Sequence, residues 1–496
     1  MLARLPVIVK PSIYLDLRII RSTYATSTAA TPKHNKQNSS KDESTKQSNV
    51  SARVAREMKD YFDSDQFDMV MNKFPASLLR RTQVSEQFYL AAPKLAKNIA
   101  KWVTDGMGPD QLLVEVNPGV GLLTKELLKK TNNLLLYETD ESFAPELEEM
   151  LKTENRNVEI RYNDFNCHWK YDFMDKIEQS RRMEKMLEGL RRVRWKDEEV
   201  NFRLFSVIGS LRFFKTMVHS VGMQKGLFQL GRCEMYLAVP PLIYMQLTCR
   251  TEAGYKLYSR NSVLFQIFFE HELIAKIPRK DFLPWPVNVS GKGKIQTQQL
   301  RLNMMGLDEL YLMRVVPRRN LFDFCLPDNL KLLMFFVSQN MISRKNRIIP
   351  ALERWIPYSG ARLILNQNYV ASSKQLVENH NDSSMIGHNS SPLREYDFPN
   401  PLTIFTEFGE LTPSQILTMF NEFISWPEYQ QSPFLQHSEQ YYTKQVHSSK
   451  QDVATATAEG SVEGSTMGVS SDKEDLMEEE EASGIADPSE TRRIKS

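Results

Sequence analysis

The chain has 496 residues, of which 41% are hydrophobic and 25% charged, and its formal net charge is only +2. This length allows two or three domains of about 100–200 residues each, and no apolar run reaches the ~20 residues that a membrane-spanning helix needs. The four cysteines are far apart without CxxC spacing and the eight histidines show no metal-binding spacing, so we expect neither a disulfide framework nor a metal site.

The N-terminus has the composition of a mitochondrial transit peptide. Residues 1–41 carry seven Lys or Arg and one acid, a local net charge of +6. A secretory signal would need an unbroken apolar stretch, which Lys10, Pro11 and Asp16 interrupt. An ordinary basic tail is the alternative. We therefore predict a transit peptide over 1–24, followed by a disordered linker over 25–74 that is rich in Ser, Thr, Lys and Asn.

The middle of the chain alternates between strand-like and helix-like patterns, which predicts an α/β sheet domain over 75–300. From about 305 the pattern becomes mostly helical, which predicts a smaller domain over 301–440. Residues 441–496 carry a net charge of −6 and are expected to form a disordered acidic tail; a regulatory segment that mimics nucleic acid is the alternative. The expected helices cover 90–103, 124–130 and 143–151, and the expected strands cover 112–116, 133–140, 158–165 and 202–210.

A glycine loop, Asn117-Pro118-Gly119-Val120-Gly121, connects the first expected strand to a helix. Such loops hold nucleotide-like ligands against backbone amides at a helix N-terminus. Glu138 ends the next strand, where a carboxylate can accept ribose hydroxyls, and Asp164 ends the third, near an adenine amine. Thr124 occupies the third glycine position of a dinucleotide fingerprint, which favours S-adenosylmethionine; an incidental turn with nearby acids is the alternative. The candidate cofactor-binding residues are Leu90, Asn117, Gly119, Gly121, Glu138 and Asp164.

Several motifs resemble those of the ribosomal RNA adenine dimethyltransferases. EVNPGVGLLT (115–124) is similar to the E-[IL]-G-P-G-x-G-x-L-T loop of that family. The resemblance implies a Rossmann-like, S-adenosylmethionine-dependent methyltransferase fold with a smaller C-terminal helical domain. Further similarities are EQFYLAAPKLA (86–96) to the Q-N-F-L motif, YETD (137–140) and NDF (163–165) to the ribose and adenine positions, GRCEMYLAVP (231–240) to the G-R-x-E strand, and LPWPV (283–287) to F-x-P-x-P-x-V.

The N-P-G form of the loop and the stretch 310–357 resemble one branch of this family, the mitochondrial transcription factor B proteins, second paralogue. The resemblance extends in patches over roughly 80–360. It implies location in the mitochondrial matrix and nucleoid, with the mitochondrial RNA polymerase and promoter DNA as partners.

The sequence departs from the family where catalysis occurs. The dimethyltransferases carry N-[LI]-P-[YF] after the fourth strand, to hold the target amine and stack on the flipped base. Here Gly209-Ser210-Leu211-Arg212 follows that strand, without Asn or Pro, and Phe88 replaces the Asn of Q-N-F-L. We therefore predict no catalytic residue at this degenerate motif and a cofactor site that is vestigial. The alternative is a surviving dimethyltransferase of small-subunit ribosomal RNA, with Phe213 or Phe214 stacking on the base.

Two basic segments are candidates for contact with nucleic acid. The charged segment 174–199 has the pattern of a solvated helix with i,i+4 ion pairs, and a nucleic-acid or polymerase contact is its alternative. Residues near 314–347 combine cations, which bind phosphates, with Phe322, Phe324 and Trp355, which could stack on unpaired bases. Phe335 and Phe336, by contrast, have the spacing of core residues. The predicted nucleic-acid-binding residues are Arg318, Arg319, Arg344, Lys345 and Arg347.

Overall fold

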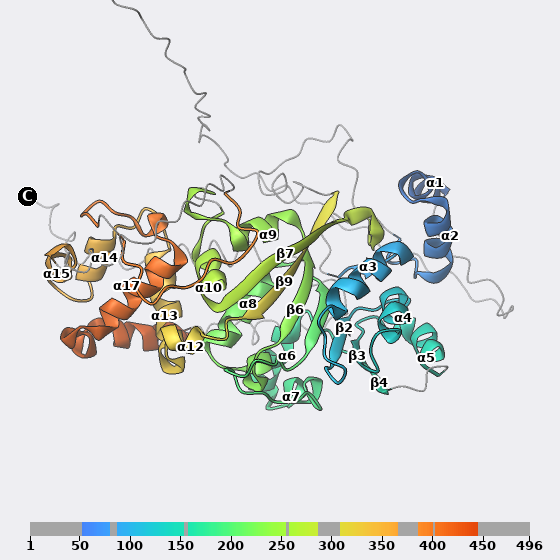
Figure 1. Ribbon diagram of the computed structural model, residues 1–496, viewed down its shortest axis with the longest axis horizontal. Helices are drawn as coiled ribbons and strands as arrows, with labels where there is room; N and C mark the ends of the chain where they lie inside the picture. Colours follow the sequence, from blue (N-terminus) through green and yellow to red (C-terminus); the bar gives the residue numbers. More distant parts are fainter. Residues whose placement is uncertain are drawn as a thin grey trace, which may run out of the picture. The chain divides into compact units, whose positions relative to one another are not determined.

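The computed structural model describes residues 52–79, 87–152, 157–253, 257–285, 308–365, 385–399 and 402–444. Its main element is a seven-stranded sheet with the order β4-β3-β2-β5-β6-β9-β7 (Figure 1). Strands β4 to β6 in that order are parallel, whereas β9 runs antiparallel to both β6 and β7. The strands are β2 (Leu113–Val116), β3 (Asn133–Tyr137), β4 (Asn157–Arg161), β5 (Arg203–Val207), β6 (Glu234–Val239), β7 (Phe269–Pro278) and β9 (Glu309–Pro317), and a separate pair joins β1 (Tyr89–Leu90) to β8 (Phe282–Leu283).

Helices cover both faces of this sheet, because successive side chains of a strand point to opposite faces. In β3, Leu134 and Leu136 pack into one cluster with α3 (Pro93–Thr104) and α4 (Leu122–Leu128). Leu135 and Tyr137 belong to the cluster on the other face, with α8 (Leu211–Gly222) and α10 (Arg260–Phe268). The arrangement confirms the predicted α/β, Rossmann-like fold class. The remaining helices of this part are α5 (Ala144–Lys152), α6 (His168–Glu178), α7 (Arg182–Met186) and α9 (Pro241–Thr248).

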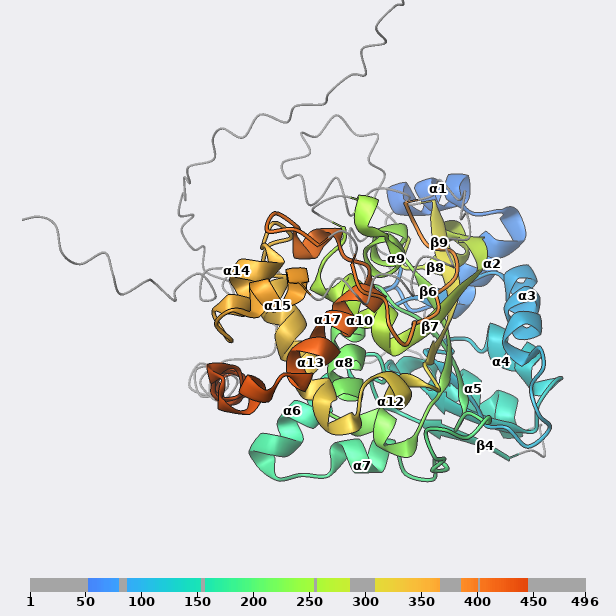
Figure 2. The same cartoon turned by 60° about the vertical axis from the view of Figure 1, so that its left-hand side comes forward.

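The C-terminal helices share the second of these clusters with the sheet. Phe335 and Phe336 are 2% and 0% exposed, which confirms their prediction as core residues. Phe336 packs against Phe420 and Phe423, with ring centroids 5.5 and 5.7 Å apart. Figure 2 shows this helical group next to α10. Its helices are α12 (Leu321–Phe324), α13 (Pro327–Asn340), α14 (Ile348–Glu353), α15 (Ser359–Leu365) and α17 (Pro413–Ser425).

Part of the predicted linker is folded. Two helices, α1 (Ala52–Tyr61) and α2 (Ser64–Lys73), fall inside the range 25–74 that the composition assigned to disorder. Their few apolar residues are spaced four apart, so that Met58 with Phe62 and Val70 with Phe74 form buried stripes. The low average hydrophobicity of residues 25–74 led to the prediction of disorder, because an average does not show the spacing of apolar residues. The predicted transit peptide, the rest of the linker and most of the acidic tail lie outside the described residues.

Two further boundaries differ from the sequence analysis. Strand β9 lies beyond residue 300, so the sheet continues into the range expected to be mostly helical. The charged segment 174–199 is not one helix, because the chain turns between α6 and α7. The carboxylate of Asp175 accepts hydrogen bonds from the backbone N–H groups of Arg182 and Met183, each at 2.9 Å, and so stabilises this turn.

Within the described residues no helix combines the length and hydropathy needed to cross a bilayer. The same part of the chain contains no group of three or more His, Cys, Asp or Glu placed to hold a metal ion.

Candidate functional site

The glycine loop lies at the carboxyl ends of the parallel strands, between β2 and α4. Its Asn117, Gly119 and Gly121 have positive φ angles of 55°, 57° and 71°. A Cβ atom on Gly119 would lie 2.9 Å from the ring of Tyr89, and one on Gly121 would lie 2.5 Å from Met150. Both positions therefore need glycine for conformation and for space. As predicted from the sequence, this glycine loop connects a strand to a helix. The side chains of Tyr89 and Met150 pack closely against it.

Glu115 lies in β2, directly below this loop, and is 2% exposed. Its Oε2 atom accepts a hydrogen bond from the hydroxyl of Thr124 at 2.8 Å. Burial raises the pKa of Glu115 to about 8, since a low-dielectric surrounding disfavours the carboxylate. The side chain is therefore mostly protonated at neutral pH. Thr124, which the sequence analysis used to argue against a dinucleotide, serves here to hold Glu115.

Glu138 is completely buried at the end of β3. Its Oε1 atom accepts hydrogen bonds from the backbone N–H groups of Thr139 and Asp140, both at 2.8 Å, and from the hydroxyl of Tyr89 at 3.2 Å. Its Oε2 atom accepts from the N–H of Gly119 at 2.9 Å. A carboxylate offers about four acceptor positions. The protein therefore supplies three donors to Oε1 and one to Oε2, which leaves one acceptor position on Oε2.

Tyr89 is the residue that sequence reasoning missed. It lies in β1, opposite Leu283 of β8, and is 1% exposed. Its ring packs over Gly119 and against Phe143, with ring centroids 5.1 Å apart in the second contact. Burial raises the pKa of Tyr89, so its hydroxyl is neutral and can donate to Glu138. Tyr89 occupies the position of the Phe in the Q-N-F-L motif. Its extra hydroxyl is the feature of the sequence from which this hydrogen bond could have been suspected.

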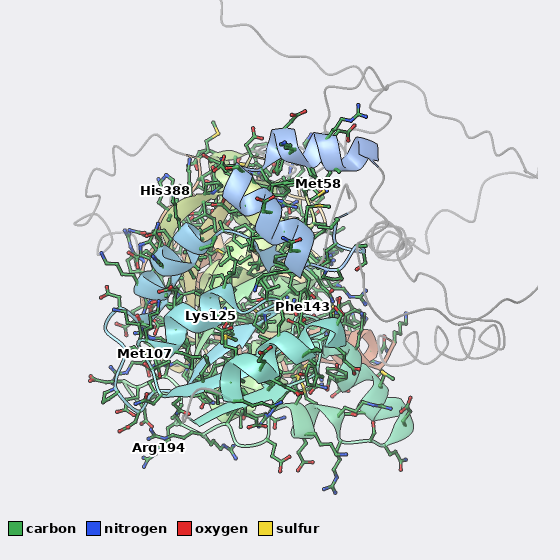
Figure 3. The ribbon with its side chains drawn as sticks, turned by 90° about the vertical axis from the view of Figure 1, so that its right-hand side faces the viewer. Met58, Met107, Lys125, Phe143, Arg194 and His388 are labelled. Carbon is green, nitrogen blue, oxygen red and sulfur yellow. The ribbon has the colours of Figure 1, made fainter. Side chains whose placement is uncertain are left out.

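The N-terminal helices close the site from outside. Phe74, which follows α2, packs against Phe143 with ring centroids 5.9 Å apart. The indole N–H of Trp285 donates to the carbonyl of Leu79 at 3.0 Å and so fixes the segment that follows α2. Phe74, Phe143 and Trp285 belong to one hydrophobic cluster with Met58 of α1. Figure 3 faces this side of the molecule and labels Met58 and Phe143.

The other predicted cofactor residues are used in part by the fold. The side-chain oxygen of Asn117 accepts from the Thr139 hydroxyl at 2.9 Å, while its buried Nδ2 has no partner among the described residues. Asp164 is half-buried after β4, and its carboxylate accepts from the N–H of Cys167 at 3.0 Å. Leu90 is buried in β1 and pairs with Phe282. The structure brings Asn117, Gly119 and Glu138 together; Leu90 follows Tyr89 at their edge.

Some features of this geometry suit S-adenosylmethionine, and others compete with it. The unpartnered Nδ2 of Asn117 and the two glycines are features that a ligand could use. The carboxylate of Glu138, however, already accepts four hydrogen bonds from the protein, and one of them comes from the hydroxyl of Tyr89. A ribose hydroxyl at Oε1 would compete with the hydroxyl of Tyr89 for Glu138.

The loop after β5 has lost the groups that would orient an amine. Gly209 has no side chain, and the Ser210 hydroxyl caps α8 by accepting from the N–H of Arg212 at 3.2 Å. The guanidinium of Arg212 lies 3.5 Å from the ring centroid of Trp169 and covers that ring. Phe213 and Phe214 are 3% and 1% exposed. The alternative in which either ring stacks on a target base is therefore wrong, because both rings belong to the core.

The predicted nucleic-acid-binding arginines divide into two groups. Arg318 is 4% exposed and donates to the carbonyls of Gln266 and Ser391, while Arg344 donates to those of Thr251 and Gly409. These two arginines hold loops together and do not present their charges to a ligand. Of the other predicted residues, Arg319 pairs with Glu198 at 3.2 Å, and Lys345 and Arg347 are exposed.

The aromatic residues predicted to stack on bases pack against other side chains of the protein instead. Trp355 is 8% exposed and packs against Phe434, with ring centroids 5.3 Å apart. Phe322 packs against Trp195 at 4.8 Å, and Phe324 lies against the core. In the charged segment, Arg182 pairs with Glu178 and Arg191 with Glu199, as a solvated surface would. A nucleic-acid surface therefore needs other aromatic residues.

Comparisons with known proteins identify the family of the chain. The family described as "Ribosomal RNA adenine dimethylase" matches residues 80–382. Over 440 residues the chain is 36% identical to "Dimethyladenosine transferase 2, mitochondrial" of Drosophila melanogaster, covering 85% of this chain and 94% of the relative. It is 23% identical to the protein of the same name from Bos taurus, covering 64% of this chain and 79% of the relative. Among solved structures, a dimethyladenosine transferase from Plasmodium falciparum is similar with a TM-score of 0.39 and 12% identity, covering 68% of this chain and 97% of that one.

Proposed function

Because the chain belongs to the ribosomal RNA adenine dimethylase family, we propose that it is a member in which the methyltransferase fold binds nucleic acid without transferring methyl groups. Its role is that of a mitochondrial transcription initiation factor. It acts with the mitochondrial RNA polymerase to melt promoter DNA and hold the opened strand.

The observation that carries this proposal is that both the cofactor-binding part and the amine-binding part of the site differ from what methyl transfer needs. On the cofactor side, four donors of the protein itself already contact Glu138. On the acceptor side, Gly209 offers no side chain to orient an amine, and the guanidinium of Arg212 packs over the ring of Trp169. Methyl transfer needs both partners in line, and a misplacement of about 1 Å can cost a hundredfold in rate. A vestigial cofactor site is the consequence.

The nucleic-acid part of the proposal rests on the exposed cations of the C-terminal helical region. Lys345 and Arg347 lie between α13 and α14, at the surface. Arg319 is half exposed, and its bond to a surface carboxylate is of the kind that contributes little to stability. Such side chains can exchange a carboxylate for a phosphate at low cost. Cations of this kind give affinity without sequence preference.

Mitochondrial location is the second element of the proposal. The names of the fly and bovine relatives both include the word mitochondrial. The acid-poor, Arg-containing N-terminus of this chain has the matching composition. Fusing residues 1–40 to a reporter should direct it to mitochondria, and a reporter that stays in the cytosol would contradict the assignment.

A second candidate function is adenine dimethylation of mitochondrial small-subunit ribosomal RNA. The intact glycine loop favours it, together with the transferase names of the relatives. For this activity Tyr89 would have to release Glu138, and an amine would have to be held without a side chain at Gly209.

Reconstitution separates the two candidates. The chain lacking residues 1–24 is assayed with the mitochondrial polymerase for run-off transcription from a mitochondrial promoter. The same preparation is assayed for methyl transfer to a small-subunit ribosomal RNA hairpin. The proposal requires promoter-dependent transcript and no methylated adenine; methylated hairpin without transcript would establish the second candidate.

A further inference from the structure

A second feature of the C-terminal region is an exposed apolar pair next to the basic residues. Ile404 and Phe405 are 52% and 64% exposed. They lie on the loop that precedes the short helix η6 (Phe408–Glu410). Leaving apolar surface in water forgoes about 25 cal/mol for each Å² that burial would remove from solvent. An aromatic ring displayed in this way next to cations calls for a ligand.

The loop that carries Phe405 is fixed. The N–H of Ile348 donates to the carbonyl of Thr406 at 3.0 Å, and the N–H of Phe408 donates to the carbonyl of Asn346 at 2.9 Å. Before Phe405 in the chain, the hydroxyl of Thr403 accepts a hydrogen bond from the N–H of Phe405 at 3.2 Å. The exposed ring is therefore presented on a preorganised loop, which lowers the entropy cost of binding.

One cation packs on this ring, and a second lies two residues before that cation in the chain. The guanidinium of Arg347 lies 5.2 Å from the ring centroid of Phe405, and Lys345 is exposed two residues earlier. Among the described residues neither cation forms an ion pair with a carboxylate. Glu407, which pairs with Arg347 through the backbone, directs its own carboxylate to cap η6. The positive charge at the ring is therefore available to an anion.

We propose that Phe405 and Arg347 form a platform on which an unpaired base of a single-stranded nucleic acid stacks, with Lys345 next to a phosphate. A flat ring accepts any base, a guanidinium stacks as well as pairs, and the surrounding positive charge suits a phosphate backbone. The inference builds on the proposed function, and it names where the opened strand is held.

The test compares two oligonucleotides with the same charge. Fluorescence anisotropy measures binding of the full chain to a labelled oligothymidine of about 20 nucleotides, longer than one binding site, and to a matching strand with abasic sites. The wild-type chain should prefer the strand with bases. Phe405→Ala should weaken oligothymidine binding by about tenfold, the value of one stacked base, and leave the abasic strand unchanged. Arg347→Gln should weaken both and lower the log–log salt slope by about 0.7.

Two further variants make the test specific to stacking. Phe405→Trp should retain the preference for bases, and Ile404→Ala, which removes a neighbouring apolar group without a π face, should leave it unchanged. Equal losses of oligothymidine binding from Ile404→Ala and Phe405→Ala would contradict stacking, because Ile404 has no π face. Unchanged oligothymidine binding by a folded Phe405→Ala chain would also overturn the proposal. Neither result depends on polymerase, so a failure here leaves the transcription assay to judge the proposed function independently.

Discussion

The hydroxyl of Tyr89 donates a hydrogen bond to Oε1 of Glu138 at 3.2 Å, between side chains that are 1% and 0% exposed. In this pair the protein supplies its own substitute for a ribose hydroxyl. The bond also connects the outer layer to the glycine loop, because the ring of Tyr89 contacts Phe143, against which Phe74 packs. Closing the cofactor site thereby contributes to the core.

The first prediction concerns this bond. Tyr89→Phe removes one of the donors to Glu138 and restores one acceptor position. We expect the variant to bind S-adenosylmethionine more tightly than the wild-type chain in calorimetry. It should also unfold more easily, by about 0.5–1.5 kcal/mol, since one buried hydrogen bond is lost.

Glu138→Ala provides the control. It should abolish any heat of cofactor binding in both the wild-type and the Tyr89→Phe backgrounds. Tight binding by the wild-type chain, unaffected by Tyr89→Phe, would show that the closed arrangement does not limit the cofactor.

The second prediction concerns pH. Burial raises the pKa of Glu115 to about 8, so the folded chain keeps a proton that the unfolded chain releases near pH 4–5. The stability that this protonated group contributes is complete at low pH and is lost as the pH rises toward 8. Glu115→Gln keeps an acceptor for Thr124 without an ionisable proton. It should raise the free energy of unfolding by on the order of 1–3 kcal/mol at about pH 8 and change it little at about pH 4.5.

Denaturant unfolding at the two pH values measures this difference. An equal effect of Glu115→Gln at both values would mean that Glu115 is already ionised in the folded chain at neutral pH.

The third prediction concerns the acceptor loop. The unmodified chain should add no methyl group to a ribosomal adenine. Leu211 is the first residue of α8, where proline is tolerated, so Gly209→Asn with Leu211→Pro can be built without breaking the helix. Combined with Tyr89→Phe, this variant should show trace methyl transfer, measured with labelled S-adenosylmethionine. Robust methylation by the unmodified chain would establish the enzyme instead.

The fourth prediction separates the arginines by role. Arg318→Ala and Arg344→Ala should each destabilise the fold by about 1–3 kcal/mol, because they leave carbonyls without donors. Neutralising Arg319, Lys345 and Arg347 should leave the melting temperature nearly unchanged. It should lower the log–log salt slope of nucleic-acid binding by about 0.7–0.9 for each phosphate that is no longer neutralised. Reduced stability in the second set, or a reduced salt slope only in the first, would reverse the assignment.

Much of the fold could be predicted because its strands and loop carry local signals. The buried strand Leu113–Val116, the left-handed glycines and the acid at the end of β3 follow from patterns of neighbouring residues. The folding of α1 and α2 could not be inferred from composition. Their stability comes from distant partners such as Trp285, whose ring lies 5.7 Å from that of Tyr61 in α1, centroid to centroid.

The residues that form the site could be predicted from the sequence, but the hydrogen bonds that they make could not. The sequence indicates Gly119 and Glu138, yet nothing local indicates that Tyr89 donates a hydrogen bond to this carboxylate from another strand. Likewise, Arg318 and Arg319 are adjacent in sequence and opposite in exposure, because a single step along the chain turns one guanidinium inward. Charge counts cannot distinguish the two.

The most direct test of the central claim is run-off transcription from a mitochondrial promoter by the polymerase and this chain, with no S-adenosylmethionine in the reaction. We predict promoter-dependent transcript that is unchanged when S-adenosylmethionine is added, and equally strong with Glu138→Ala if that variant is folded. Absence of transcript, or transcript that appears only with the cofactor, would contradict the claim.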